Sequence, residues 1–282
     1  MNRHPKCPIY PKDKFMSFTI IGELINTTRT KVRTAVALRD VKALQKLVRL
    51  QEENGAGYID VNTGTGVQTE HQDMQWLIKT VQAVATVPLC IDSPDPGVLE
   101  SALDLVDRPP MVNSITLEKN RFGRMMDLLK GRDCQVVALC MDDTGMPQTA
   151  DEICKRAEQL VNGLTGIGVR PEAIWIDPLV APVSVETRNG SMALAAVAAI
   201  KKRLIGVKTL CGLSNISFGL PARRIINRTF LSLMVSRGLD GALFDPLDRE
   251  LSAALHTTRM LMGQDDYCLE FMDRVAAGRI LA

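Results

Sequence analysis

The stretch GYIDVNTGTGVQTEHQDMQWLIKTVQAVATVPLCIDS (57–93) contains two short apolar runs separated by a longer segment. The runs GYIDVN (57–62) and PLCIDS (88–93) are aliphatic at consecutive positions, which is typical of strands that are buried on both faces of a parallel sheet. The segment 70–85 between them has the apolar spacing of an amphipathic helix. The stretch therefore predicts one strand–helix–strand unit.

The same alternation extends along the whole chain. The other apolar runs are FTIIGE (18–23), PMVNSI (110–115), CQVVALC (134–140), AIWIDP (173–178), KTLCGLS (208–214) and GALFDP (241–246). Segments of helical period separate them, at 40–53, 95–106, 118–130, 149–166, 190–204 and 222–237, and another follows the last run at 248–262. Eight strand–helix repeats with right-handed crossovers close most naturally into an α/β fold, a single-domain (β/α)8 TIM barrel. A doubly wound open sheet is the alternative, but no G-x-G-x-x-G motif follows the first strand.

The barrel is expected to comprise residues 17–282, with a final helical segment (265–282) that extends past it. Residues 1–16 contain three prolines and no apolar centre, so we expect a polar leader rather than a signal peptide. No stretch reaches the roughly 18 apolar residues of a membrane span. The net charge of +2 and the lack of a basic run argue against a nucleic-acid partner. The seven cysteines form no C-x-x-C pair, which favours free thiols in the cytoplasm over a disulfide framework or a metal site.

Polar residues cluster where the predicted strands end. Because the carboxyl ends of barrel strands meet at one mouth, where active sites of this fold lie, we expect these side chains to converge. They are Glu23, Asn26, Asp60, Asn62, Asp92, Asn113, Asp177, Ser214, Asn215 and Asp245. Any one of them could instead cap a helix or shape a turn. Together they form a set of carboxylates and carboxamides that suits a flat ligand with several N–H donors.

The chain lacks the residues that other reactions of (β/α)8 barrels require at the strand ends. None of the three histidines (4, 71 and 256) ends a predicted strand, so no metal site is expected at the mouth. Lys208 begins the seventh run rather than ending it, which disfavours a Schiff base. Ser214 has no histidine near it in the sequence to complete a hydrolytic triad.

Seven short motifs occur in order along the barrel: GELIN (22–26), DVN (60–62), CIDS (90–93), MVNS (111–114), WIDPL (175–179), GLSNISFG (212–219) and INRTF (226–230). In this series the chain resembles the pterin-binding methyltransferases, among them methyltetrahydrofolate:corrinoid/iron–sulfur protein methyltransferase and the folate domain of cobalamin-dependent methionine synthase. Each motif is weak alone, whereas the ordered set spans roughly residues 18–268 and is specific.

The resemblance implies roles for particular residues. Asp92, Asn113 and Asp177 would bond the pterin ring, and Asn215 would reach N5, the atom that carries or receives the methyl group. The remaining implied substrate-binding residues are Glu23, Asn26 and Asp60 in the polar floor, Gly212 and Ser214 where the backbone approaches the ring, and Phe218, which would pack against the ligand or a lid. Arg223 would lie near the folate tail, and the adjacent Arg224 is an alternative. Phe218 stands where the corrinoid/iron–sulfur enzyme has Gln, which disfavours that enzyme and favours the wider family.

The implied reaction is methyl transfer between N5 of tetrahydrofolate (or 5-methyltetrahydrofolate) and the cobalt of a corrinoid. No histidine lies in a D-x-H-x-x-G corrinoid loop, so the corrinoid (a cobalamin) would be held by a partner protein. The expected direction is from methylcorrinoid to tetrahydrofolate, as in a demethylation system, and the family suggests a homodimer. The alternatives are the acetyl-CoA pathway enzyme, a dihydropteroate synthase, which would need a lysine in its seventh-strand motif where this chain reads SNIS (214–217), and a folate-binding protein without catalysis.

Overall fold

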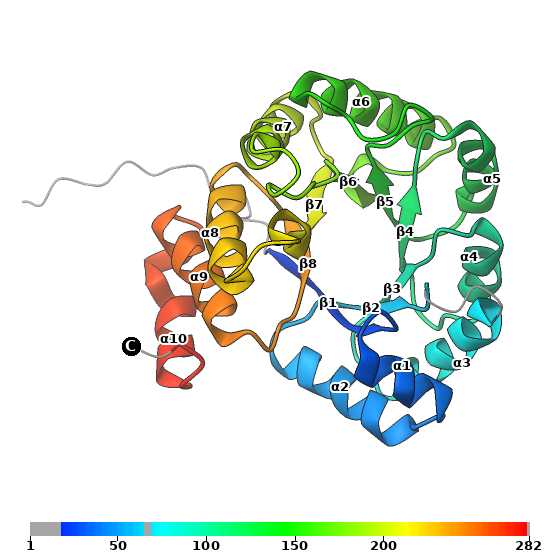
Figure 1. Cartoon of the computed structure of the whole chain (residues 1–282), viewed down its shortest axis with the longest axis horizontal. Coiled ribbons are helices and arrows are strands. Elements are labelled where there is room, and N and C mark those ends of the chain that lie inside the picture. Colours follow the sequence, from blue (N-terminus) through cyan, green and yellow to red (C-terminus); the bar gives the residue numbers. More distant parts are fainter. Residues whose placement is uncertain (1–17, 65–68, 281–282) are drawn as a thin grey trace, which may run out of the picture.

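Eight parallel strands form a closed barrel in chain order, β1-β2-β3-β4-β5-β6-β7-β8, surrounded by helices. The computed structural model describes residues 18–64 and 69–280. Figure 1 shows the ring of strands, with the helices α2 to α9 following one another around its outside. The predicted (β/α)8 barrel is therefore confirmed. The proposed leader (1–16) lies outside the described residues.

All eight predicted strands are present, most of them slightly shorter than their apolar runs. They are β1 (Thr19–Asn26), β2 (Tyr58–Asn62), β3 (Leu89–Asp92), β4 (Met111–Ile115), β5 (Gln135–Leu139), β6 (Ile174–Asp177), β7 (Lys208–Gly212) and β8 (Gly241–Phe244). The helices are α1 (Thr30–Ala37), α2 (Val41–Glu53), α3 (Glu70–Gln82), α4 (Pro96–Leu103), α5 (Lys119–Leu129), α6 (Ala150–Gly166), α7 (Asn189–Arg203), α8 (Arg223–Ser236), α9 (Arg249–Leu261) and α10 (Leu269–Ala276). Three short 3-10 helices complete the set: η1 (Pro171–Ala173), η2 (Leu213–Ser217) and η3 (Asp266–Cys268).

Several of the outer helices have an N-cap residue whose side-chain oxygen accepts a backbone hydrogen bond. The Asp95 carboxylate accepts a hydrogen bond from Gly97 N at 2.7 Å, directly before Pro96 starts α4. Thr149 caps α6 at Glu152 N, and Asp248 caps α9 at Leu251 N. Such caps satisfy backbone donors that have no partner inside the helix, and each contributes about 1 kcal/mol. They fix where each helix starts after its strand.

Two features differ from the sequence analysis. Helix α1 was not expected, because its sequence TKVRTAVA is short and has only Val32 and Val36 as buried positions. Strand β1 continues past the expected end at Glu23 to Asn26, with a register shift between Gly22 and Ile25. The final segment does extend past the barrel, since α10 packs outside α9 (Figure 1).

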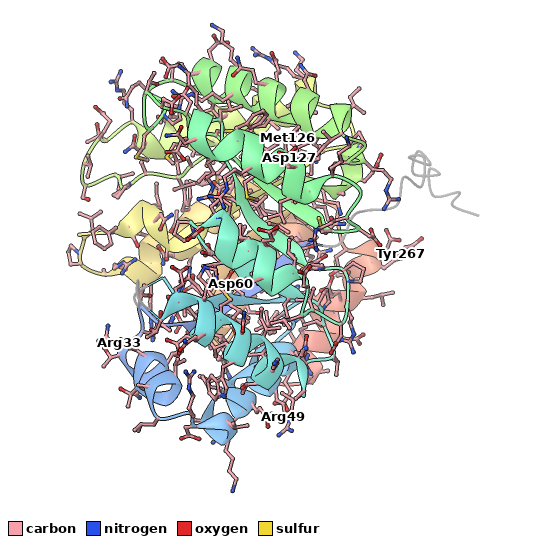
Figure 2. All side chains as sticks on the ribbon, turned by 90° about the vertical axis from the view of Figure 1, so that its right-hand side faces the viewer. Arg33, Arg49, Asp60, Met126, Asp127 and Tyr267 are labelled. Atoms are coloured by element: carbon pink, nitrogen blue, oxygen red, sulfur yellow. The ribbon has the colours of Figure 1, made fainter. Side chains whose placement is uncertain are left out.

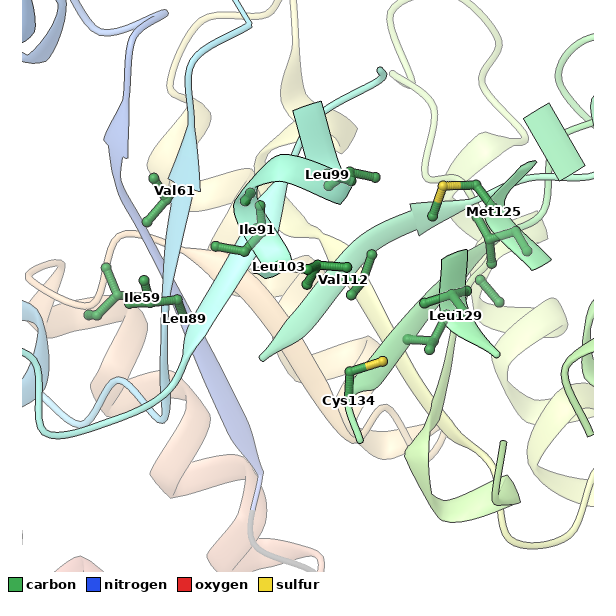
Figure 3. Packing of buried hydrophobic residues seen from close by; sticks show 14 of the residues in the cluster. Ile59, Val61, Leu89, Ile91, Leu99, Leu103, Val112, Met125, Leu129 and Cys134 are labelled. Carbon is green, nitrogen blue, oxygen red and sulfur yellow. The ribbon is translucent and has the colours of Figure 1, made fainter. Parts of the chain in front are cut away.

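Alternate residues of each strand face opposite sides of the barrel wall. The outward residues pack under the helices: Ile59, Val61, Leu89, Ile91 and Val112 lie against Leu99, Leu103, Met125 and Leu129 (Figure 3). A separate cluster fills the barrel interior, with Ile21, Cys90, Met111, Val137, Trp175 and Leu210 buried and Tyr58 and Leu243 partly buried. Each of the eight strands contributes one of these inward side chains, as is typical of a packed barrel core. Within the described residues, no helix is both long and apolar enough to span a membrane.

Candidate functional site

The period of the strands explains which polar residues face the interior. Side chains on a strand alternate between its two faces, so the residue two positions beyond an inward core residue also points inward. Asp92 lies two positions after Cys90, Asn113 two positions after Met111, and Asp177 two positions after Trp175. The same step leads from Ile21 to Glu23, from Tyr58 to Asp60 and from Leu210 to Gly212. The carboxyl end of the barrel thus carries a polar layer directly above the apolar one.

Strand register places part of this layer in one row. Asn26 is paired with Asn62, Asn62 with Asp92, and Asp92 with Asn113, on four neighbouring strands. The Asn62 amide donates a hydrogen bond to Asp92 Oδ2 at 2.7 Å. Adjacent parallel strands lie about 4.8 Å apart, so these four side chains stand at regular intervals along the carboxyl end of the barrel.

A cavity of about 810 Å³ opens at this end of the barrel. Ten of the residues predicted for the site line it: Glu23, Asn26, Asp60, Asp92, Asn113, Asp177, Gly212, Ser214, Asn215 and Arg223. Arg224 lines it as well. Phe218 does not line it: this residue is 65% exposed, and the Arg223 guanidinium carbon lies 5.9 Å from its ring centroid. The expected contact between Phe218 and the ligand therefore has no support from the cavity wall.

Asp177 is held in place by backbone donors. Its Oδ1 accepts a hydrogen bond from Leu179 N at 2.7 Å, and Gly212 N–H also points at the carboxylate. Burial outweighs these bonds and raises the pKa of Asp177 to about 7. Because the charged form is poorly solvated here, the carboxylate is suited to a ligand that supplies further N–H donors.

Two more carboxyl groups lie close together on β2 and β3. Burial raises the pKa of Asp92 to about 6, while the Asn62 hydrogen bond and the charge of Arg121 act in the opposite direction. Asp60 is 1% exposed, and Figure 2 shows it inside the molecule, whereas Tyr267 lies at the surface. Burial and the nearby Asp92 raise the pKa of Asp60 well above its usual range. Asp60 Oδ1 has no hydrogen-bond partner among the described residues, so the floor of the site holds a polar atom that a ligand could satisfy.

Asn215 stands at the wall of the cavity on the 3-10 turn η2. Its side-chain amide makes no hydrogen bond to any described residue, although Phe218 N donates to its backbone oxygen at 3.1 Å. Gly212 provides the room for this amide, since a Cβ atom at position 212 would lie 3.0 Å from Asn215 Nδ2. The glycine was expected to let the backbone approach the ligand. The structure gives it a further role, that of leaving space for the amide.

Two arginines of the site were missed by the sequence analysis. Arg29 forms an ion pair with Glu23 at 2.6 Å, and burial raises the pKa of Glu23 in spite of this partner. Arg121, on α5, donates from Nη2 to Ser93 O at 3.0 Å and to Ser114 O at 2.7 Å, and from Nη1 to Pro94 O. It thus joins the ends of β3 and β4 next to Asp92 and Asn113. No sequence motif marks it, because an arginine in the first turn of a surface helix is ordinary.

The cavity combines buried carboxyl groups, which accept hydrogen bonds when ionised, with carboxamides that can both accept and donate, among them Asn26, Asn113 and Asn215. In residues 18–64 and 69–280 no group of three or more His, Cys, Asp or Glu side chains is arranged to hold a metal ion. The geometry therefore suits the binding of a flat, donor-rich ring, with Asn215 at its edge.

The chain matches a known protein family over most of its length. The family model described as pterin binding enzyme matches residues 22–243. Methylcorrinoid:tetrahydrofolate methyltransferase from Eubacterium limosum is 33% identical over 263 residues, which cover 93% of this chain and 97% of the relative. Methionine synthase from Mycobacterium tuberculosis is 32% identical over 240 residues, 80% of this chain but 20% of that larger protein.

Among solved structures, dihydropteroate synthase from Xanthomonas albilineans in complex with 7,8-dihydropteroate superposes with a TM-score of 0.66. The match covers 88% of this chain and 94% of the other at 20% identity. The same enzyme with 4-aminobenzoic acid gives a TM-score of 0.67 at 19% identity. At this identity the likeness shows a shared fold.

Proposed function

Because the chain belongs to the pterin-binding enzyme family, we propose that it is a methyltransferase acting between the N5 atom of tetrahydrofolate and the cobalt of a corrinoid. The relative that covers 93% of the chain is a methylcorrinoid:tetrahydrofolate methyltransferase, which favours transfer from the methylcorrinoid to tetrahydrofolate, as in a demethylation system. The corrinoid belongs to a separate partner protein that docks at the barrel mouth. A homodimer in the cytoplasm is part of the same proposal, and the mass of the purified protein in solution tests the dimer.

The observation that carries the proposal is the position of Asn215. Its amide lies without a partner among the described residues, at the edge of a cavity that is also lined by the carboxyl groups of Asp60, Asp92 and Asp177. The pterin ring of tetrahydrofolate presents donors at its 2-amino group, N3 and N8. In the proposed pose Asp92, Asn113 and Asp177 accept or share these hydrogen bonds, Asn26, Asp60 and Glu23 form the floor, and Ser214 lies beside the ring.

Methyl transfer changes the charge on N5, and Asn215 can follow that change. The N5 lone pair attacks the methyl carbon, and both electrons of the cobalt–carbon bond stay on cobalt. N5 then carries its hydrogen and a positive charge, so Asn215 Oδ1 can accept the N–H. Before the transfer, the amide can bond N5 in either sense, because it has both a donor and an acceptor. An interaction that is stronger at the charged transition state lowers the barrier.

The proton on N5 leaves to solvent, because an amide does not titrate. The buried carboxyl groups Asp60 and Asp92 favour the charged intermediate when they are ionised. In the reverse direction the same contacts would hold protonated 5-methyltetrahydrofolate while cob(I)alamin attacks its methyl group.

The deciding experiment mixes the purified protein with methylcobalamin and tetrahydrofolate under strictly anaerobic conditions and follows the cobalt spectrum. A second reaction contains cob(I)alamin and 5-methyltetrahydrofolate. Conversion in either direction supports the methyltransferase. Tight folate binding with no conversion, even when the corrinoid protein is added, would favour a folate-binding protein instead.

A further inference from the structure

Four arginines line the mouth cavity: Arg29, Arg121, Arg223 and Arg224; no lysine among the described residues does so. Two of the four are already engaged, Arg29 by Glu23 and Arg121 by three backbone carbonyl oxygens. A cation that binds the carboxylates at the far end of a folate must be free of other strong partners. The question is therefore which of Arg223 and Arg224 fills this role.

Arg223 is bound into the turn that carries Asn215. Its Nε donates to Ser217 Oγ at 3.0 Å, and its Nη2 donates to Ser214 O at 2.8 Å. Ser217 Oγ in turn donates to Ser214 O at 3.2 Å. These bonds close a small network around η2, with Asn215 between its two anchoring residues. A guanidinium that makes two directed hydrogen bonds fixes its partners more tightly than a point charge would.

Arg224 has no such engagement. Its side chain is 82% exposed, and the nearest carboxylate oxygen, Asp248 Oδ2, is 4.0 Å from Nε. Asp248 is held by other groups, because its Oδ1 accepts from Leu251 N at 3.0 Å and from Arg228 Nη2 at 3.3 Å. Adjacent residues of a helix point about 100° apart, which explains why one guanidinium turns onto η2 and the other does not.

Arg224 also lies at the boundary of a second cavity of about 510 Å³ between β8, α8 and α9. That cavity has charges of both signs in its wall, because Arg228 and Arg249 line it together with Asp245, Asp248 and Glu250.

We propose that Arg224 binds the carboxylates of the glutamyl tail of the folate and that Arg223 is a positioning residue that holds the Asn215 turn. This inference rests on the proposed function. It assigns recognition of the tail to Arg224 and orientation of the reacting end to Arg223.

The test compares two methyl acceptors, tetrahydrofolate and 6-methyltetrahydropterin, which has the same ring but no carboxylate. Arg224→Gln should raise the KM for tetrahydrofolate about three- to tenfold, as for loss of an exposed ion pair, and should reduce the preference for tetrahydrofolate by the same factor. Arg223→Gln should lower kcat about tenfold with both acceptors and leave that preference intact. Ser217→Ala should act in the same direction as Arg223→Gln, and the two changes together should cost less than their product because they break one network.

Arg188→Gln is the matched control, since the Arg188 side chain is also 82% exposed but does not line the mouth cavity. Arg188→Gln should leave kcat and KM for both methyl acceptors as they are in the wild type. Arg223→Lys keeps a donor near Ser214 O and should restore part of kcat, which separates positioning from loss of folding. The reverse pattern, with Arg223→Gln reducing the preference and Arg224→Gln not, overturns the proposal.

Failure of the proposed function is distinguishable from failure of this inference. If the wild type transfers no methyl group, calorimetry with the same two ligands still measures the preference for the tail. Arg224→Gln should then reduce the ratio of the affinity for tetrahydrofolate to the affinity for 6-methyltetrahydropterin. Arg223→Gln should weaken both affinities by the same factor. An unchanged ratio in Arg224→Gln would refute the role of Arg224, and a changed ratio in Arg223→Gln would refute the role of Arg223.

Discussion

The amide of Asn215 lies against Gly212, so closely that a Cβ atom on residue 212 would come within 3.0 Å of Asn215 Nδ2. Gly212 ends β7 with φ −72° and ψ 94°, a conformation that any residue can adopt. A side chain at residue 212 would therefore press on the amide of Asn215, which would have to shift by a few tenths of an ångström.

Replacement of Gly212 by alanine should displace the Asn215 amide. We expect Gly212→Ala to lower the rate of methyl transfer a few-fold, because a shift of a few tenths of an ångström weakens a transition-state contact without removing it. Steady-state kinetics with methylcobalamin and tetrahydrofolate measures the effect. Gly123→Ala on α5 is the control, since a Cβ there meets nothing within 4 Å. An unaltered rate in Gly212→Ala would show that the amide position does not matter.

Removal of the amide itself should have a larger effect. Asn215→Ala should lower methyl transfer by roughly 10², the usual contribution of one transition-state hydrogen bond. Folate affinity should change little, because the other ring contacts remain. Equilibrium binding and single-turnover rates separate the two quantities. A near-normal single-turnover rate would exclude Asn215 from the chemistry.

Asp177 should make folate binding depend on pH. With its pKa at about 7 in the free protein, the carboxyl must lose a proton before it can accept ring hydrogen bonds, so affinity should fall as the pH drops below 7. Asp177→Asn should weaken binding by about 1.5–3 kcal/mol and flatten this dependence between pH 6 and 8, roughly one unit either side of that pKa. Calorimetry over that range measures both. Equal pH dependence in the variant would contradict the assignment.

The same carboxyl predicts how the stability of the free protein responds to pH. The folded pKa of Asp177 is raised above the usual unfolded value of about 3.9. Ionisation of this carboxyl therefore costs more free energy in the folded state than in the unfolded state. Its contribution to the free energy of unfolding decreases as the pH rises from about 4 to 7, and is constant above that range. Asp177→Asn should remove it, which denaturant titrations at several pH values can detect.

Arg121 should matter for both stability and binding. Arg121→Gln removes the charged donor shared by Ser93 O and Ser114 O, and we expect a loss of about 2–3 kcal/mol in the free energy of unfolding. It also removes the charge that lowers the pKa of Asp92. The pH below which folate affinity falls should therefore move to a higher value. Urea denaturation and binding curves test the two effects. Arg124→Gln, on the exposed side of the same helix, should change neither.

The strands were predictable because a buried parallel strand leaves a short aliphatic run, as in Ile174–Asp177. The inward direction of Asp92, Asn113 and Asp177 also follows from the two-residue period, once the apolar layer below them is known. Helix α1 could not be predicted in this way, since it is short and only Val32 and Val36 in it are buried.

The roles of the arginines depended on tertiary structure. Arg121 precedes Phe122 in an ordinary amphipathic segment, and nothing local shows that its guanidinium reaches two strand ends. Arg223 and Arg224 are adjacent, so sequence patterns cannot separate them. Only the path of η2 beside α8 brings Ser214 O and Ser217 Oγ to one of the two. The position of Phe218, outside the cavity wall, was likewise a matter of loop geometry.

The ring of strands has a consequence for biosynthesis. Asn26 lies on β1, Asp177 on β6 and Asn215 after β7, while β1 joins β8 only after residues 241–244 have been made. A partly synthesised chain therefore contains the individual polar residues but does not yet hold them around one cavity. Pterin in the cell cannot guide the early stages of folding on the ribosome, and it stabilises the molecule by mass action only once the last strand has closed the circle.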